Sequence, residues 1–335
     1  MTPPVPDHDD LPTYTARSPA DLLAMAPWLL GFHPEDSVVV LTFGVPGGCF
    51  HARVDLAATT AEQRQVSELI LEALGRHHVP RVAILVYSDD PARSRSQAGM
   101  LLDGLLSAGV EVVDLLRADG RRWWSWPQFD TSGTPYDLSS HPFTAQRVLA
   151  GDVVLGSRRE VAESLAGPPD PATAQAAEEY VDRIAGVLHD GGDPAMLRAE
   201  ARWVQRRLRR HLRDGRPLPP SDAGRLLALS SVVPVRDVAW SEMTRRTARS
   251  HVALWRDLVR RCPPALLPPA ASLLAFAAWL AGDGALAWCA VDRALERDAD
   301  YSMAHRVADC LAGAVPPSVW SPVPEGELPV FADSP

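Results

Sequence analysis

SPADLLAMAPWLLGFHPEDSVVVLTF, from Ser18 to Phe43, combines a helix, a polar loop and a strand. Ser18 is expected to be an N-cap, Pro19 to take the first helical position, and Asp21 to complete a capping box. Gly31 is expected to end the helix. The unbroken apolar run Ser37–Phe43 is rich in β-branched residues and predicts a buried strand. The stretch therefore predicts a helix and a strand that share one core.

The same alternation continues beyond this stretch. Apolar residues at helical spacing predict helices over 61–75 and 93–108. Further strands are predicted over 49–56, 81–87, 110–116 and 121–126. The last two are separated by Asp119-Gly120, which is typical of a hairpin turn. Strands alternating with helices predict an α/β domain with a mixed sheet over residues 1–167.

The pattern becomes purely helical after Gly167-Pro-Pro-Asp-Pro171, which reads as a linker. Helices are predicted over 172–189, 194–213, 221–231, 235–261, 265–281, 284–297 and 301–312. Small residues between Ala275 and Leu311 resemble one tetratricopeptide-like helical hairpin, although a repeat array needs about three such units. We expect an all-α domain over 172–320 that ends in this hairpin, followed by a Pro-rich, disordered tail over 321–335.

Composition narrows the class of protein. Hydrophobic residues make up 46% of 335 residues, so a sizeable core is expected. The 33 basic residues are outnumbered by 42 acidic ones, which argues against a chain that mainly coats nucleic acid or membrane. The apolar run Cys262–Gly282 contains four prolines and predicts a buried helix rather than a membrane span. Met1–Asp10 lacks the basic and apolar pattern of a signal peptide, so a cytoplasmic protein is expected.

All basic residues apart from histidine are arginine, because the chain contains no lysine. A Walker-type phosphate loop needs its lysine and is therefore excluded. A lysine Schiff base is excluded as well, and with it pyridoxal phosphate chemistry. The four cysteines do not form a C-x-x-C or zinc-ligand pattern and are expected to be thiols.

Several motifs resemble one family of proteins. They are Leu29–Ser37 (LLGFHPEDS), Pro80–Tyr87 (PRVAILVY), Gly120–Ser125 (GRRWWS), Gly282–Trp288 (GDGALAW) and Pro316–Trp320 (PPSVW). Together they are similar to the actinobacterial family called domain of unknown function 4192. The resemblance implies an architecture and a cytosolic, actinobacterial source, and it carries no assigned reaction.

Carboxylates follow the predicted strands and are the first candidates for a site. Asp55, Asp89, Asp90 and Asp119 each come at or after a strand end. Ligands of open α/β sheets bind at the carboxyl ends of parallel strands, where such oxygens would hold Mg²⁺. The alternative is structural, because an aspartate at a strand end also caps the next helix or makes a turn. Glu35 and Asp36 are expected at the opposite end of the sheet, because they precede their strand.

The two other candidates for a functional site are a histidine and a group of arginines. His33 lies in a loop, where it would act as a general base or ligand, or would hold the turn by hydrogen bonds. One helical stripe of arginines would contact nucleic acid or an acidic partner, or would pair with the chain's own acids. Its members are Arg198, Arg202, Arg206, Arg209 and Arg213.

No catalytic motif is recognisable, so the leading hypothesis is a non-catalytic binding or regulatory protein with a protein partner. It would act through the α/β cleft or the helical surface. The alternative is a metal-dependent hydrolase or phosphoesterase that uses the strand-end carboxylates, and the third is nucleic-acid binding through the arginine stripe. The enzyme hypothesis requires the carboxylates to surround one cleft.

Overall fold

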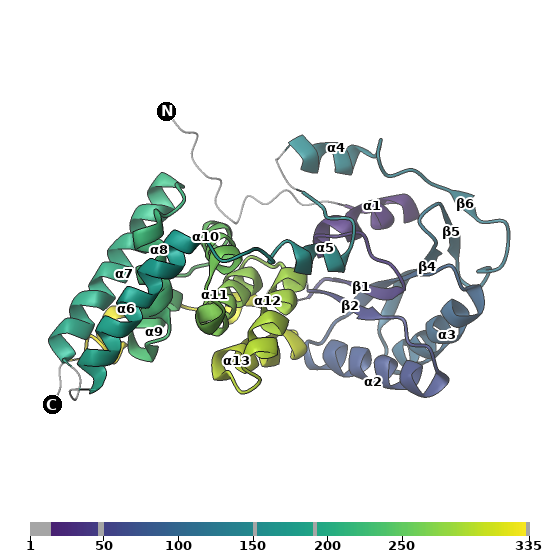
Figure 1. Ribbon diagram of the computed structural model, residues 1–335. Helices are drawn as coiled ribbons and strands as arrows, with labels where there is room; N and C mark the ends of the chain where they lie inside the picture. The colour runs from purple at the N-terminus through teal and green to yellow at the C-terminus, as the bar shows by residue number, and fades with distance from the viewer. Residues whose placement is uncertain (1–14, 46–49, 150–152, 190–192, 333–335) are drawn as a thin grey trace. The chain divides into compact units, whose positions relative to one another are not determined.

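A computed structural model describes residues 15–45, 50–149, 153–189 and 193–332. Contacts between residues divide the chain at Glu160 and Val161 into an α/β unit and a helical unit (Figure 1). The α/β unit holds a six-stranded sheet, and the unit that follows is made of helices within the part described. The predicted order of an α/β part and then a helical part is confirmed.

The sheet has the strand order β2-β1-β3-β4-β5-β6. The strands are β1 (Ser37–Phe43), β2 (His51–Asp55), β3 (Arg81–Tyr87), β4 (Glu111–Ala118), β5 (Arg122–Ser125) and β6 (Thr134–Pro135). β3 and β4 are parallel, whereas every other neighbouring pair is antiparallel. The sheet is therefore mixed, as predicted, and the hairpin at Asp119-Gly120 joins β4 to β5.

Helices cover both faces of the sheet. The helices of this unit are α1 (Pro19–Leu30), α2 (Thr60–Arg76), α3 (Pro91–Ser107) and α4 (Pro142–Leu149), and α5 (Arg158–Glu163) spans the division between the units. In Figure 1, α2 and α3 lie on one side of the sheet and α1 lies on the other. The predicted capping box of α1 is present, and Gly31 ends the helix with a φ of 79°. That left-handed conformation suits glycine.

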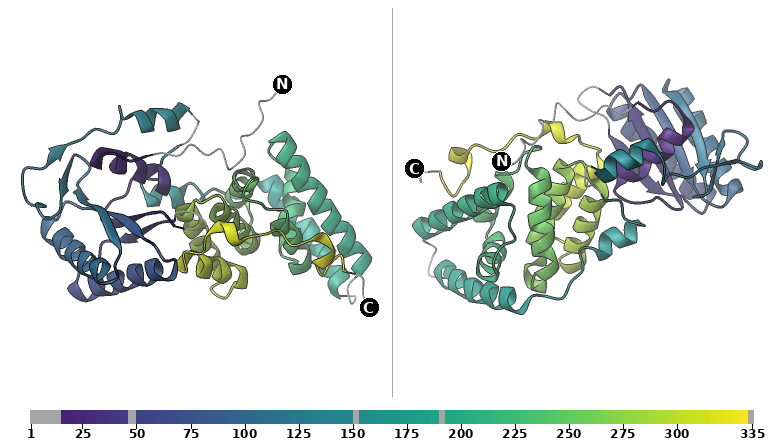
Figure 2. Two further views of the ribbon diagram at one scale, coloured as in Figure 1. Left: turned by 180° about the vertical axis from the view of Figure 1, so that it is seen from behind. Right: turned by 90° about the horizontal axis from the view of Figure 1, so that it is seen from above.

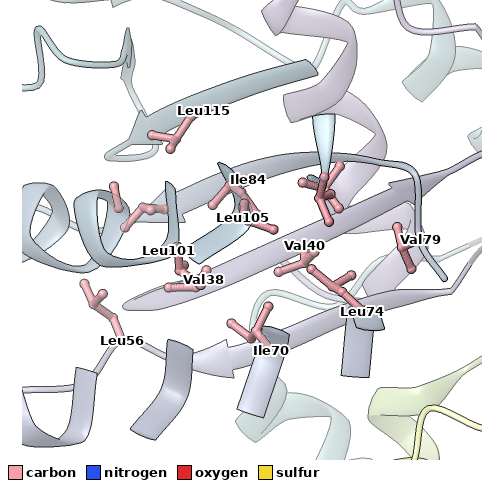
Figure 3. Packing of buried hydrophobic residues seen from close by; sticks show 14 of the residues in the cluster. Val38, Val40, Leu56, Ile70, Leu74, Val79, Ile84, Leu101, Leu105 and Leu115 are labelled. Carbon is pink, nitrogen blue, oxygen red and sulfur yellow. The ribbon is translucent and has the colours of Figure 1, made fainter. Parts of the chain in front are cut away.

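The core under α2 and α3 is built by alternating strand residues. Val38 and Val40 of β1 and Ile84 of β3 pack against Leu101 and Leu105 of α3 (Figure 3). Because successive residues of a strand point to opposite faces, Tyr87 lies on the other face, toward α1. This alternation assigns the last residue of β3 to the side of the sheet that carries the cavity described below.

The helical unit contains eight longer helices in the described residues, two views of which are given in Figure 2. They are α6 (Pro171–His189), α7 (Pro194–Asp214), α8 (Pro220–Ser230), α9 (Val233–Ser241), α10 (Ala248–Arg261), α11 (Leu267–Leu280), α12 (Gly284–Arg297) and α13 (Ser302–Ala312). Three-residue 3₁₀ turns lie at Pro264–Leu266, Pro317–Val319 and Glu325–Glu327. Among the described helices, none is both long enough and apolar enough to cross a bilayer.

The structure corrects one predicted helix. The sequence predicts a single helix over 235–261, but α9 ends at Ser241 and α10 begins at Ala248. Between them, the amides of Thr244 and Thr247 each donate to the hydroxyl of the other residue, at 3.0 and 3.2 Å. Threonine side chains that bond the local backbone compete with helix hydrogen bonds, so the pair interrupts the helix.

The predicted helical hairpin is present. α11 packs against α12 and α13, and Gly282 joins α11 to α12 with a φ of 79°. The side chains of Ala277 and Ala278 on α11, and of Ala287 and Ala290 on α12, are fully buried. Small residues at these positions allow the two helices to approach closely. Membership of a repeat array stays a prediction.

The predicted linker and tail differ from their expected roles. Asp170 donates its amide to the carbonyl of Arg261 at 3.2 Å, so the Gly167–Pro171 segment lies within the helical unit rather than between units. In the tail predicted as disordered, most residues from Ser321 to Ala332 are exposed, but Leu328 and Val330 are buried. Its proline content prevents a long helix, but these two apolar side chains anchor it. Residues 333–335 lie outside the described residues.

Candidate functional site

The α/β unit contains a cavity of about 700 Å³. One wall is the second half of α1, including Trp28, and the next is the loop His33–Asp36. The floor consists of residues that end β3 and β4, at 87–89 and 118–120. Residues 136–139, Thr144 of α4 and Val154 complete the lining. Its volume lies within the range of small-molecule sites.

The direction of β1 brings the loop and the strand ends together. β1 is antiparallel to β3, with Ser37 opposite Tyr87, so Asp36 lies beside Ser88. The amide of Ser88 in turn donates to the carbonyl of Ala118 at 2.9 Å, next to Asp119. The expectation that Glu35 and Asp36 lie at the opposite end of the sheet is wrong, because it took β1 to run parallel to β3.

A polar cluster holds the loop against β3. Ser88 Oγ donates to Asp36 Oδ1 at 3.0 Å, and the Arg93 guanidinium pairs with the same carboxylate. Asp36 adopts a φ of 37°, a left-handed conformation that aspartate tolerates better than most residues. Its carbonyl accepts a hydrogen bond from the amide of Leu56 at 2.8 Å. These bonds fix the rim of the cavity at Asp36.

Arg117 supports the floor from below. Its guanidinium donates to the carbonyls of Ser88, Asp89 and Phe129 at 2.8–3.0 Å, and it stacks on Trp124 at 4.2 Å. Burial lowers the pKa of Arg117, while the negative charges of nearby aspartates act in the opposite direction. The planar fork of arginine suits several acceptors at fixed angles, so this residue determines the path of the loop after β3.

Two tyrosines line the cavity. Tyr87 is 6% exposed, and its hydroxyl has no hydrogen-bond partner among the described residues. Burial, together with the nearby Tyr136, raises the pKa of Tyr87 well above its usual value. Burial and the charge of Asp119 raise the pKa of Tyr136 to about 12. Both phenols are therefore neutral near pH 7.

Three of the predicted site residues meet in this cavity. His33, Asp89 and Asp119 all contribute to its lining. The side chain of Asp89 is exposed, and none of the described residues bonds to it. Asp119 accepts the amides of Arg121 and Arg122 at 2.8 and 2.6 Å, which makes the hairpin turn. His33 lies on the rim and donates its amide to the carbonyl of Leu155 at 3.0 Å.

The other two predicted carboxylates lie at the same sheet edge but outside the lining. Asp90 is the N-cap of α3 and accepts the amides of Ala92 and Arg93. The hydrogen bond from the Arg93 amide is the main reason that the pKa of Asp90 is lowered. Asp55 lies opposite Ser37 and pairs with Arg53 at 2.6 Å. Asp90 has the helix-capping role that the alternative interpretation gave it, whereas Asp55 forms an ion pair within β2 and caps no helix, since Thr59 is the N-cap of α2.

A metal ion needs several oxygen or nitrogen ligands around one point. Among the described residues, no three histidine, cysteine, aspartate or glutamate side chains form such a group. Mg²⁺ at Asp89, Asp90 and Asp119 therefore stays a prediction that the side-chain positions do not support.

The arginine stripe lies on α7 and is partly neutralised. Arg202 pairs with Glu325 at 3.0 Å and Arg209 pairs with Glu242 at 2.8 Å. Arg206 and Arg213 are exposed, whereas Arg198 is half-buried. Pairing with the chain's own acids is the alternative that the sequence analysis left open, and it accounts for two of the five arginines.

Sequence reasoning missed Asp36, Tyr87, Tyr136 and Asp137 as lining residues. The connections between the strands could have indicated where Asp36 lies. A tight turn after β1 makes β2 antiparallel to it, and a helical crossover from β2 to β3 favours a parallel orientation of those two strands. If β1 lies between them, it must be antiparallel to both. The tyrosines and Asp137 gave no comparable signal.

A single family model matches residues from both units. The family model described as a domain of unknown function, DUF4192, matches residues 19–318. The chain belongs to the DUF4192 family. The match spans the cavity and nearly all of the helical unit, so the site is part of a DUF4192 domain. No curated protein and no solved structure matches the chain.

Proposed function

We propose that this DUF4192 chain is a non-catalytic binding or regulatory protein that acts through the cavity of its α/β unit. The observation that carries the proposal is a cavity of about 700 Å³ at the carboxyl ends of β3 and β4. Ligands of α/β sheets bind at this edge. The residues around it are held by bonds that exist without a ligand, so the cavity is preformed.

The polar groups of the lining support binding rather than catalysis. Asp119 and Asp137 accept bonds from neighbouring amides, which fix turns. Asp36 is paired with Arg93. A general base usually needs a partner that orients it, and among the described residues the ring of His33 has no carboxylate bonded to it. The polar groups of the lining are therefore arranged to bind a ligand rather than to transform it.

Thermal unfolding of the full chain with a panel of small molecules tests the proposal. Any ligand that binds only the native state raises the Tm by mass action. Thr144→Trp fills the cavity from α4 and is expected to abolish the shift. Gln146→Trp is the control, because Gln146 is exposed on the same helix and outside the lining. The proposal fails if no class of ligand shifts the Tm, or if both variants respond alike.

A metal-dependent hydrolase or phosphoesterase is the second candidate. Its basis is that His33, Asp89 and Asp119 line one cavity, although these side chains do not form a metal-binding group in the part of the chain described. This candidate predicts that Mg²⁺ or Mn²⁺ raises the Tm and that Asp89→Ala removes the effect. It also predicts hydrolysis of a phosphate ester that depends on the same residue.

We also propose a cytosolic location, an actinobacterial source, a tetratricopeptide-like character for α11–α13 and a protein partner. The location is supported by Cys262 and Cys310, which are free thiols. The source rests on the family resemblance and the lysine-free composition. A pull-down with the full chain tests the partner. Nucleic-acid binding is less favoured, because Arg202 and Arg209 are paired within the chain.

A further inference from the structure

The cavity lining is strongly acidic. It contains the carboxylates of Glu35, Asp36, Asp89, Asp119 and Asp137, while His33 is its single titratable nitrogen among the described residues. Asp36 is balanced by Arg93. The side chains of Glu35 and Asp89 make no hydrogen bond or ion pair among the described residues, and Asp119 and Asp137 accept bonds from neutral groups only. No positive group of the lining pairs with these four carboxylates, although Arg117 beneath the floor offsets part of the charge of Asp89 and Asp119.

The helix beside the cavity adds to this negative potential. The second half of α1 lines the cavity, and its last turn contains no basic residue. The C-terminal end of a helix carries a partial negative charge that attracts cations. Two positive helix ends are also near: the N-terminus of α3, which Asp90 already caps, and the first turn of α4, in which Thr144 lines the cavity. The end of α1 thus favours a cation, whereas the first turn of α4 does not, so the carboxylates of the lining decide the sign of the ligand's charge.

Tyr87 is an independent sign that a ligand belongs here. Its side chain lines the cavity from the α1 face of the sheet, is more than nine-tenths buried, and leaves its hydroxyl without a partner in the described part of the chain. A buried hydroxyl without a hydrogen bond is costly to the folded protein. A polar ligand that reached this hydroxyl would remove the cost.

Aromatic rings and carboxylates together recognise organic cations. Trp28, Tyr87 and Tyr136 all line the cavity. A cation over an aromatic face gains from the ring quadrupole, most strongly where water is excluded. Carboxylates distributed around about 700 Å³ do not converge on a single ion, which agrees with the absence of a metal-binding group among the described residues. They fit a molecule whose positive charges are also distributed.

We propose that the cavity binds a small organic cation with two or more amino or guanidino groups. The inference rests on the proposed function and specifies its ligand class. Glu35 and Asp89 would pair with the charged groups, and the Tyr87 hydroxyl would bond a polar atom of the ligand. The rings of Trp28 and Tyr136 would cover the aliphatic or cationic parts.

Calorimetric titration of the full chain with spermidine and with agmatine tests the ligand class. Inorganic phosphate, glucose and Mg²⁺ are the comparison probes. We expect the amines to bind, with an affinity that falls as salt is added. Glu35→Gln and Asp89→Asn are each expected to weaken binding about tenfold, which is the value of one charge-assisted hydrogen bond.

Two matched control variants each remove the negative charge of a carboxylate that lies outside the cavity lining. Asp103→Asn on α3 and Glu111→Gln at the start of β4 alter exposed carboxylates outside the lining, and they are expected to leave the affinity within about twofold, because screened surface charges act weakly at this range. Equal losses in the controls and the cavity variants would mean nonspecific attraction and would overturn the inference.

Tyr87→Phe separates a ligand contact from a structural role. Without ligand, the variant is expected to raise the Tm, because it removes an unpaired buried hydroxyl. With ligand, it is expected to bind several times more weakly. A higher Tm with unchanged affinity would show that the hydroxyl does not touch the ligand.

The outcomes distinguish the ligand class from the function itself. Binding of phosphate, glucose or Mg²⁺ in place of the amines, blocked by Thr144→Trp, would overturn the ligand class and keep the proposed function. No binding by any probe or panel member would overturn both.

Discussion

At the scale of single residues, neighbouring aspartates have different roles. Asp90 caps α3, whereas Asp89 faces the cavity with an exposed side chain. Asp90→Ala is expected to lower the Tm by about 2–4 °C, because two amides of α3 lose their acceptor. Asp89→Ala is the control and is expected to leave the Tm of the free protein unchanged. Thermal unfolding by circular dichroism measures both.

The effect of Asp90 also depends on pH. Hydrogen bonds, first that of the Arg93 amide, lower the pKa of Asp90 below its ordinary value of 3.8. A carboxyl whose pKa is lower in the folded state than in the unfolded state stabilises the folded state. This contribution is complete at a pH above the unfolded-state pKa, and it is lost as the pH falls through the folded-state pKa. The Tm difference between Asp90→Ala and wild type is therefore expected to be present at pH 6 and to shrink below about pH 4. A difference that is constant down to pH 2 would contradict the capping role.

Arg117 is the residue whose loss is expected to be most damaging to the floor of the cavity. Three carbonyls accept its N–H groups, and Trp124 stacks on it. Arg117→Lys keeps the charge but reaches fewer acceptors, so buried carbonyls lose their bonds. We expect the free energy of unfolding to fall by about 2–3 kcal/mol. Urea unfolding measures the change, and a loss below about 0.5 kcal/mol would show that water replaces the guanidinium.

At the scale of helices, two glycines have opposite roles. A Cβ at Gly224 of α8 would lie 2.6 Å from the amide nitrogen of Ala177 on α6, whereas a Cβ at Gly186 of α6 would meet nothing within 4 Å. Gly224→Ala is expected to destabilise the helical unit by about 1–3 kcal/mol, because α6 and α8 must separate. Gly186→Ala is expected to stabilise it by about 0.5–1 kcal/mol through helix propensity. Denaturant unfolding of the two variants compares them directly, and the same sign for both would contradict this packing.

The elements themselves could largely be predicted from local sequence. The capping box at Ser18 and the apolar runs of β1 and β3 are local signals, and the structure confirms them. The break at Thr244 was missed, because threonine is tolerated inside helices and only its reciprocal bond with Thr247 reveals the interruption. Local pattern therefore predicts where an element begins more reliably than where it is divided.

The site was less predictable, because it depends on strand direction. An unbroken apolar strand such as β1 carries no mark of its direction, so Asp36 was assigned to the wrong edge of the sheet. Asp89 and Asp119 were placed correctly, since they follow parallel strands. Tyr87 was hidden in the motif PRVAILVY, where a tyrosine at the end of a buried strand resembles any other core residue.

At the scale of the whole molecule, the last described segment is attached to the helical unit by few contacts. Leu328 is buried, Glu325 pairs with Arg202, and Phe331 lies 4.9 Å from the Arg202 guanidinium. Leu328→Ala is expected to release the segment and to increase its cleavage by chymotrypsin about tenfold or more, because cleavage follows the open population. Val319→Ala is the control, since Val319 is 62% exposed. Equal cleavage of the two variants would show that Leu328 does not anchor the segment.

The two cavity tyrosines also limit the tolerance of the molecule to alkali. The chain has no lysine, so few groups other than tyrosine and cysteine lose a proton between pH 9 and 11, and burial also raises the pKa of the Cys262 thiol to about 12. Unfolded tyrosine ionises near pH 10, whereas the pKa of Tyr136 is about 12 and that of Tyr87 is raised well above its usual value. A raised folded pKa stabilises the protein fully below pH 10, and this contribution disappears as the pH rises toward 12. The urea midpoint of the wild type is therefore expected to fall between pH 9 and pH 11. The fall is expected to be smaller in the Tyr87→Phe/Tyr136→Phe variant, where Cys262 accounts for what remains. The part that the tyrosines contribute weakens the edge of the sheet where the ligand is expected to bind.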